Sequence, residues 1–189
     1  VRIFVRRKSG IEHPKLEELV VDFRDSQTWK KFLEGDVLLS ALGTTVKQAG
    51  SKEKEYEVDY TFNLNFATAA SENGIKTYVL VSSVGANPDS AIFYSRMKGQ
   101  LDEAVMKLGF EKTIILRPSI LDGKREEKRL AETIAIKAGG FFMKFIFRKY
   151  RPIKDETVAR AMIRAALNEK VGPGKNIYTA DELFSLAEG

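Results

Sequence analysis

A serine pair, a tyrosine and a lysine form the most informative chemical pattern in the sequence. Ser82 and Ser83 follow a short apolar run, and Tyr94 and Lys98 lie four residues apart in the helical segment that comes next. Residues at positions i and i+4 project from the same face of a helix. An ammonium group beside a phenol favours the phenolate and lowers a tyrosine pKa from ~10 toward neutral pH. Such a tyrosine can exchange a proton with a carbonyl or alcohol oxygen, and a serine hydroxyl can hydrogen-bond the same oxygen.

The tyrosine–lysine spacing by itself has a simpler interpretation. A tyrosine and a lysine four residues apart occur often by chance. On an amphipathic helix, Tyr94 would more often be a core residue. A serine pair directly after a buried strand makes the combination much less common by chance. We therefore expect one of the two serines, Ser82 or Ser83, to act with Tyr94 and Lys98 on one oxygen.

Short apolar or β-branched runs alternate with longer helical patterns along the chain. The runs predict strands over residues 1–5, 19–21, 36–41, 78–82, 113–117 and 176–179. Apolar spacing of three and four residues predicts helices over 26–32, 52–73, 89–108, 126–138, 155–168 and 181–187. Continuously apolar strands are typical of sheets buried on both faces. The order therefore predicts an α/β protein with a parallel sheet and helices on both faces.

Length and composition indicate one folded domain over residues 1–189. The chain is 43% hydrophobic and 30% charged, which excludes a disordered protein. It has no cysteine and one histidine, so we expect no disulfide, thiolate chemistry or metal centre. No apolar run approaches the ~20 residues that span a bilayer, and no signal peptide is recognisable, so we expect a cytoplasmic protein. The net charge of +5 permits a phosphate-bearing partner without requiring nucleic acid.

Ligands of open α/β sheets bind beyond the carboxyl ends of the strands. Arg6, Arg7 and Lys8 follow the first run and could hold a phosphate, although a solvated turn would look the same. A small-residue loop follows the third run and allows close backbone approach to a cofactor, as would any tight turn. Its residues are Ala41, Leu42, Gly43 and Thr44.

The residues after the fourth and fifth runs resemble a known superfamily. Val-Ser-Ser-Val-Gly-Ala at 81–86, the Tyr94 to Gly99 segment, Leu-Arg-Pro at 116–118 and the helix start at 155–159 are similar to short-chain dehydrogenases/reductases. Within that superfamily the chain looks like the atypical branch of Tat-interacting oxidoreductase-like proteins and their fungal mitochondrial relatives. The resemblance covers the whole chain and implies a Rossmann-type, doubly wound parallel sheet that binds a nicotinamide dinucleotide.

The resemblance also implies roles for individual residues. Tyr94 would be the acid/base, Lys98 would lower its pKa and hold the nicotinamide ribose, and Ser83 would orient the substrate oxygen. Asn63 is similar to the position that completes a proton relay in some members. The implied cofactor contacts are Arg6, Arg7, Asp22, Phe23, Ala41, Leu42, Gly43, Thr44, Lys98, Pro118, Ser119 and Ile120.

The resemblance favours NADP, with NAD the less favoured cofactor. Arg6 and Arg7 match the place where NADP-preferring members hold the 2′-phosphate. No acidic residue ends the first run, where an NAD-preferring member would bind the ribose hydroxyls.

One element of the family pattern is missing from the given residues. The chain opens at what would be the second strand, without the glycine-rich strand–loop–helix that binds the pyrophosphate. A sheet without its central strand leaves the adjacent strands unpaired. We therefore expect a β-loop-α unit of about 25–30 residues upstream. Dinucleotide binding would not be expected of a natural protein that lacks this unit.

Residues 122–150 depart from the strand–helix alternation, and in the superfamily this region builds the substrate pocket. Their aromatic and basic part, 139–150, has three interpretations: a helix packed on the domain, a membrane or protein contact, or the lining of a hydrophobic substrate pocket. No recognised nucleic-acid motif surrounds it, so no nucleic-acid partner is expected.

Three functions follow from these patterns. The first is an NADP(H)-dependent oxidoreductase that acts on a small carbonyl or alcohol. The alternative is a non-catalytic NADP(H)-binding module that regulates or contacts another protein, and the third is an interaction protein without cofactor. The substrate, the reaction direction and the choice between monomer and homodimer stay open.

Overall fold

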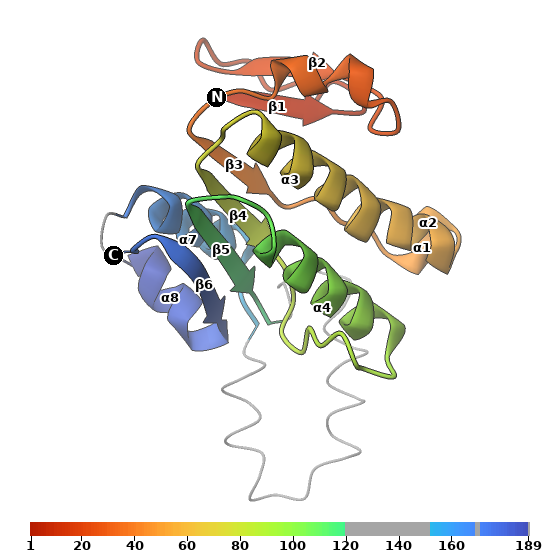
Figure 1. The fold of residues 1–189 in the computed structure, drawn as a ribbon, viewed down its shortest axis with the longest axis vertical. Coiled ribbons are helices and arrows are strands. Elements are labelled where there is room, and N and C mark those ends of the chain that lie inside the picture. The colour runs from red at the N-terminus through yellow and green to blue at the C-terminus, as the bar shows by residue number, and fades with distance from the viewer. Residues whose placement is uncertain (120–151, 169–170, 189) are drawn as a thin grey trace, which may run out of the picture.

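The computed structural model describes residues 1–119, 152–168 and 171–188, which form two parallel sheets. β1 (Arg2–Val5) pairs with β2 (Glu17–Val20) in the first sheet. The second sheet has the order β3 (Val37–Ser40), β4 (Thr77–Val81), β5 (Lys112–Arg117) and β6 (Gly174–Thr179) (Figure 1). All pairs are parallel. The six predicted strands and the α/β class are confirmed.

Helices connect the strands and cover the second sheet. They are α1 (Val46–Ala49), α2 (Lys52–Tyr56), η3 (Glu57–Phe62), α3 (Asn63–Glu72), α4 (Phe93–Met106), α7 (Asp155–Leu167) and α8 (Ala180–Glu188). α2, η3 and α3 form the continuous helical segment predicted over 52–73, and η3 is a π-helical turn within it. Gly74 ends the segment with a φ of +82°, a conformation that favours glycine. The predicted helix 26–32 consists of two 3₁₀ turns, η1 (Ser26–Thr28) and η2 (Lys30–Phe32).

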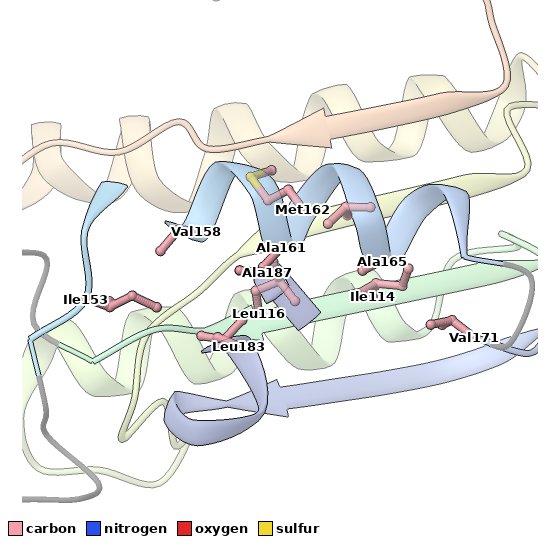
Figure 2. Close-up of a cluster of buried hydrophobic side chains, with 11 residues drawn as sticks. Ile114, Leu116, Ile153, Val158, Ala161, Met162, Ala165, Val171, Leu183 and Ala187 are labelled. Atoms are coloured by element: carbon pink, nitrogen blue, oxygen red, sulfur yellow. The ribbon is translucent and has the colours of Figure 1, made fainter. Parts of the chain in front are cut away.

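Two hydrophobic clusters sandwich the second sheet because its central strands alternate their side chains between the faces. Val79, Ile114 and Leu116 pack against α7 and α8, as Figure 2 shows for Ile114 and Leu116. Tyr78, Leu80 and Ile115 point to the opposite face. There they pack against α3 and α4 through Ala67, Leu101 and Val105.

An aromatic cluster joins the β1–β2 pair to α3. Phe66 of α3 stacks on Trp29, with ring centroids 4.0 Å apart, and contacts Phe23 and Phe4. Trp29 is only 1% exposed, as expected for a residue that closes the core next to the short helical turns. This cluster holds the first sheet against the helical layer of the second.

The two sheets present unpaired strand edges. Within the described residues, β1 pairs only with β2, and β3 only with β4. Leu39 of β3 is 44% exposed, and Ile163 and Leu167 of α7 are 50% and 72% exposed. Leu39 shares its side of the strand with Val37, which packs against the α7 cluster. The α7 face of the sheet is therefore incompletely covered beside the unpaired edge of β3.

The predicted helix 89–108 begins later than expected, at Phe93. The residues before it form turns, because Asp89 N–H donates to the Asn87 side chain and Ile92 N–H donates to Ser90 Oγ. The predicted helix 126–138, the segment 122–150 and Ile120 lie outside the described residues.

Neither a membrane-spanning helix nor a metal-binding cluster is present among the described residues. None of their helices combines the length and apolarity that crossing a bilayer requires. No group of three or more histidine, cysteine, aspartate or glutamate side chains there could hold a metal ion.

Gly99 lets α4 pack directly on the loop that follows β4, and its replacement provides a test of this contact. A Cβ at Gly99 would lie 2.3 Å from the backbone of Asn87 and of Pro88. We expect Gly99→Ala to lower the free energy of unfolding by about 3 kcal/mol, because backbone must shift. Gly172→Ala is the control, since a Cβ there meets nothing within 4 Å. Equal stability of the two variants in urea unfolding would contradict the close contact.

Candidate active site

The loops after β4 and β5 stay joined beyond the ends of the strands. Ser82 N–H donates to Leu116 O at 2.7 Å, and Val84 N–H donates to Pro118 O at 2.8 Å. These bonds fix the Ser82–Ser83 pair beside Pro118 at the carboxyl edge of the sheet. Ser82 is buried, whereas Ser83 is half-buried and its hydroxyl donates to Val84 O at 3.3 Å. Of the two serines, Ser83 is therefore the more exposed at this edge.

Lys98 of α4 places its ammonium at this edge, where it is almost fully buried. Its side chain is 4% exposed, and Nζ donates to Val81 O at 3.3 Å. Nζ also forms an ion pair with Asp59 of η3, at 3.7 Å from Oδ1. Lys98 therefore connects α4, the end of β4 and the π-helical turn.

Asp59 in turn holds the loop that follows β3. Its Oδ2 accepts the Thr44 N–H at 2.7 Å. A Cβ at Gly43 would lie 3.1 Å from Asp59 Oδ1, so the loop passes close to the carboxylate. The Asp59 carboxylate thus contacts two expected cofactor-binding residues, Thr44 and Lys98. Sequence reasoning missed Asp59, although it lies within the predicted helix 52–73 near Asn63.

Burial and charge oppose each other at this pair. Burial is the largest influence on Lys98 and lowers the pKa of its ammonium, while the Asp59 carboxylate opposes that decrease. Burial likewise raises the pKa of Asp59, and the Lys98 charge opposes that increase. Glu55 of α2 is also buried, and desolvation raises the pKa of its carboxyl group. Of these two buried carboxyl groups, the structure shows an ion pair with Lys98 for Asp59 and not for Glu55.

Tyr94 lies one helical turn before Lys98 on α4 and is 39% exposed. The interpretation of Tyr94 as a core residue is therefore wrong. The turn before the helix is tied to it, because Asn87 N–H donates to Ser95 O and Arg96 Nη1 donates to Ser90 O. These bonds and the Gly99 contact fix the first turns of α4, and so Tyr94, against the loop after β4.

The strand β5 leads into the expected nicotinamide-side contacts. Arg117 donates through Nε to Asp102 Oδ2 of α4 at 2.9 Å, which anchors the end of β5 to the helix that carries Lys98. Pro118 and Ser119 follow and are buried. Desolvation raises the pKa of Asp102, and Arg117 opposes this.

The expected adenine-side contacts lie with the first sheet. Arg6 and Arg7 are exposed directly after β1. Asp22 is exposed and accepts the Arg24 N–H, whereas Phe23 is 7% exposed within the aromatic cluster. The side chain of Phe23 therefore belongs to the core, which leaves its backbone as the part that could meet a cofactor.

Asn63 is buried within the protein and stabilises the helical segment. Its amide donates to Val58 O, Asp59 O and Leu42 O, and its Oδ1 accepts the Ser40 hydroxyl. The amide therefore adds hydrogen bonds to two carbonyls of the π-helical turn, those of Val58 and Asp59. It also ties the turn to the loop after β3 through Leu42 O. Its expected place in a proton relay stays a prediction.

Solved structures define the class of fold. The chain superposes on a short-chain dehydrogenase/reductase superfamily protein from Agrobacterium tumefaciens with bound NAD, with a TM-score of 0.64 and 18% identity over 99% of this chain and 73% of that one. It also superposes on UDP-N-acetylglucosamine 4-epimerase from Bacillus cereus, with a TM-score of 0.63 and 18% identity over 97% and 73% of the two chains. The protein therefore has the Rossmann-like fold of this superfamily, as its sequence predicts.

Sequence relatives define the family. A model of the HIM1 family matches residues 25–151. The mitochondrial protein fmp52 of Emericella nidulans is 38% identical over 85% of this chain and 73% of the relative, and the one from Candida albicans is 38% identical over 99% and 86%. The chain belongs to the HIM1 family.

These names correct one expectation and leave another open. The expected cytoplasmic location is wrong, because relatives over most of the chain are named mitochondrial proteins. The finer resemblance to the Tat-interacting oxidoreductase-like branch stays a prediction.

Removal of one charge from the buried pair tests its electrostatics. Lys98→Met leaves the Asp59 carboxylate without its ion-pair partner, and we expect the free energy of unfolding at pH 7 to fall by about 3–5 kcal/mol. The pKa of folded Asp59 then lies further above its unfolded value, so the native state binds more protons and stability decreases as pH rises through that interval. Urea unfolding across pH 4–8 measures both effects.

The double variant Lys98→Met/Asp59→Asn serves as the control, because it contains neither charge. It should recover most of the lost stability and lack the added pH dependence. A double variant no more stable than Lys98→Met would show that the two groups do not interact as a pair.

Proposed function

We propose that the protein is an NADP(H)-dependent oxidoreductase that interconverts a small carbonyl compound and its alcohol. The observation that carries the proposal is the position of Lys98, at the carboxyl edge of a Rossmann-like sheet and one helical turn from the exposed Tyr94. The half-buried Ser83 follows the strand whose last carbonyl Lys98 contacts.

The residues at this edge fit a nicotinamide dinucleotide. Gly43 in the loop 41–44 is exposed, and without a side chain its backbone allows close approach of a cofactor. A side chain at this position would also crowd the Asp59 carboxylate. The ammonium of Lys98 suits ribose hydroxyls, and Pro118 and Ser119 lie on the neighbouring strand end. Arg6 and Arg7 offer bidentate guanidinium groups for a 2′-phosphate. Bound in this way, the cofactor would supply or accept the hydride.

The protein's own side chains would handle the proton and the substrate oxygen. In reduction, the Tyr94 hydroxyl donates its proton to the oxygen that becomes the alcohol, and in oxidation the phenolate takes that proton back. The charge of Lys98 would stabilise the phenolate. The Ser83 hydroxyl hydrogen-bonds the same oxygen and orients it.

The dinucleotide site as we propose it includes one more parallel strand, between β1 and β3. The unpaired edges of these strands and the exposed Leu39, Ile163 and Leu167 support this addition. A β-loop-α unit would pair with both edges, and its helix would cover the apolar surface and offer its N-terminus to the pyrophosphate. The names of the relatives support a mitochondrial location for the protein.

One observation favours the alternative of a non-catalytic NADP(H)-binding module. The Lys98 ammonium already contacts Asp59 and Val81 O, so its role could be to hold the fold. The two functions differ in what Tyr94 does, because a binding module needs no proton donor.

Cofactor preference tests the assignment of Arg6 and Arg7. We expect protein that carries the β-loop-α unit to bind NADPH at micromolar or lower concentrations and NADH more weakly, in a fluorescence titration. Arg6→Ala/Arg7→Ala should weaken NADPH binding at least about tenfold and leave NADH binding unchanged, because two charge-assisted hydrogen bonds are lost. Lys107→Ala removes a cation at the far end of α4 and should change neither. Absence of binding by either cofactor would overturn the proposed function.

Turnover distinguishes the enzyme from the binding module. In a screen of small aldehydes and ketones with NADPH, we expect Tyr94→Phe to reduce kcat by a factor of about 10²–10⁴, because the proton donor is removed. NADPH affinity should stay within about twofold. Wild-type activity that survives in Tyr94→Phe would exclude Tyr94 as the acid/base.

A further inference from the structure

We propose that Asp59 is a positioning residue that couples the lysine of the active site to the loop lining the cofactor. The inference rests on the proposed function, because it assigns Asp59 a task within that site. The resemblance of the sequence to short-chain dehydrogenases/reductases assigned no role to Asp59.

The geometry of the carboxylate carries the proposal. Oδ1 faces Lys98 Nζ at 3.7 Å, while Oδ2 accepts the Thr44 N–H at 2.7 Å. The two oxygens thus bind groups from two separate elements, helix α4 and the loop after β3. Both side chains of the ion pair are nearly inaccessible, at 4% and 3% exposed. Movement of the loop would therefore move the counter-charge of the lysine.

Asp59 itself is held from both sides. The Asn63 amide donates to Asp59 O at 3.0 Å within the π-helical turn. On the other side, Gly43 leaves space only for the carboxylate, since a Cβ there would lie 3.1 Å from Oδ1. A carboxylate so confined can set the position of an ammonium that has few other contacts.

Other charged groups act on Lys98 at longer range. These groups are Glu55 on α2 and Asp102 on α4. Asp102 in turn pairs with Arg117 of β5. Burial lowers the pKa of Lys98, and Asp59 provides the largest opposing effect, ahead of Asp102 and Glu55. Asp59 thus favours the charged form of the buried lysine, which the proposed ribose contact and the proposed stabilisation of the Tyr94 phenolate both require.

Two Asp59 variants separate charge from hydrogen bonding. Asp59→Asn keeps an oxygen for the Thr44 N–H but removes the charge, whereas Asp59→Ala removes both. Glu55→Gln is the matched control, because it also neutralises a buried carboxylate but one outside the ion pair. The pKa of Lys98 is read in cofactor-free protein by NMR of ¹³Cε-labelled lysine, assigned with Lys98→Met.

We expect Asp59→Asn to lower the pKa of Lys98 by about one pH unit or more, and Glu55→Gln to lower it by much less. In NADPH titrations from pH 6 to 10, the loss of affinity at high pH should move to lower pH in Asp59→Asn. Asp59→Ala should also weaken NADPH binding at low pH, where the lysine is charged, because the loop loses its anchor. An unchanged Lys98 pKa in Asp59→Asn would overturn the proposal.

A third variant keeps the test decisive if the Asp59 variants do not fold. Gly43→Ala retains every charge but displaces the carboxylate, so it should lower the pKa of Lys98 in the same direction. An unchanged pKa in Gly43→Ala would then contradict the proposal. The two proposals also fail separately: wild-type protein that binds no NADPH contradicts the proposed function, while the lysine pKa still decides the role of Asp59.

Discussion

Burial of the Lys98 ammonium constrains the whole carboxyl edge of the second sheet. A buried charge is tolerated only when protein groups replace its water. Here the Val81 carbonyl and the Asp59 carboxylate do so, and they come from β4 and from η3. Placement of α4 against the end of β4 therefore depends on the Asp59 carboxylate, which belongs to the preceding helical segment. The π-helical turn and Asn63 position Asp59, and the absence of a side chain at Gly43 leaves space for its carboxylate.

The second constraint is the pairing of parallel strands. The described strands form a pair and a group of four, with β1 and β3 each open on one edge. The aromatic cluster around Phe66 packs the β1–β2 pair against α3. The open edges of β1 and β3 therefore belong to one packed domain. The proposed catalytic residues and the expected 2′-phosphate contacts thus lie with different sheets, and the proposed additional strand would join the two sheets.

The sequence contained enough local signal for the strands, the class of fold and the helix that carries Tyr94 and Lys98. Apolar runs and i, i+4 spacing are local properties, so strand positions and the helix face of Tyr94 and Lys98 could be predicted. Asp59 could not, because its role depends on two tertiary contacts that no periodicity encodes. The late start of α4 arose from side-chain turns at Asn87 and Ser90, which compete with helix formation. The predicted cytoplasmic location was also wrong. The composition and motifs of a folded domain do not determine the compartment in which it is found.

The decisive measurement is a crystal structure of the protein with NADPH. We expect the nicotinamide ribose within hydrogen-bond distance of Lys98 Nζ, with Tyr94 and Ser83 facing the nicotinamide. We also expect Thr44 beside the cofactor and the 2′-phosphate against Arg6 and Arg7. A dinucleotide bound away from the carboxyl ends of β3, β4 and β5, or a Lys98 that contacts only Asp59 and Val81 in the complex, would contradict the proposed site.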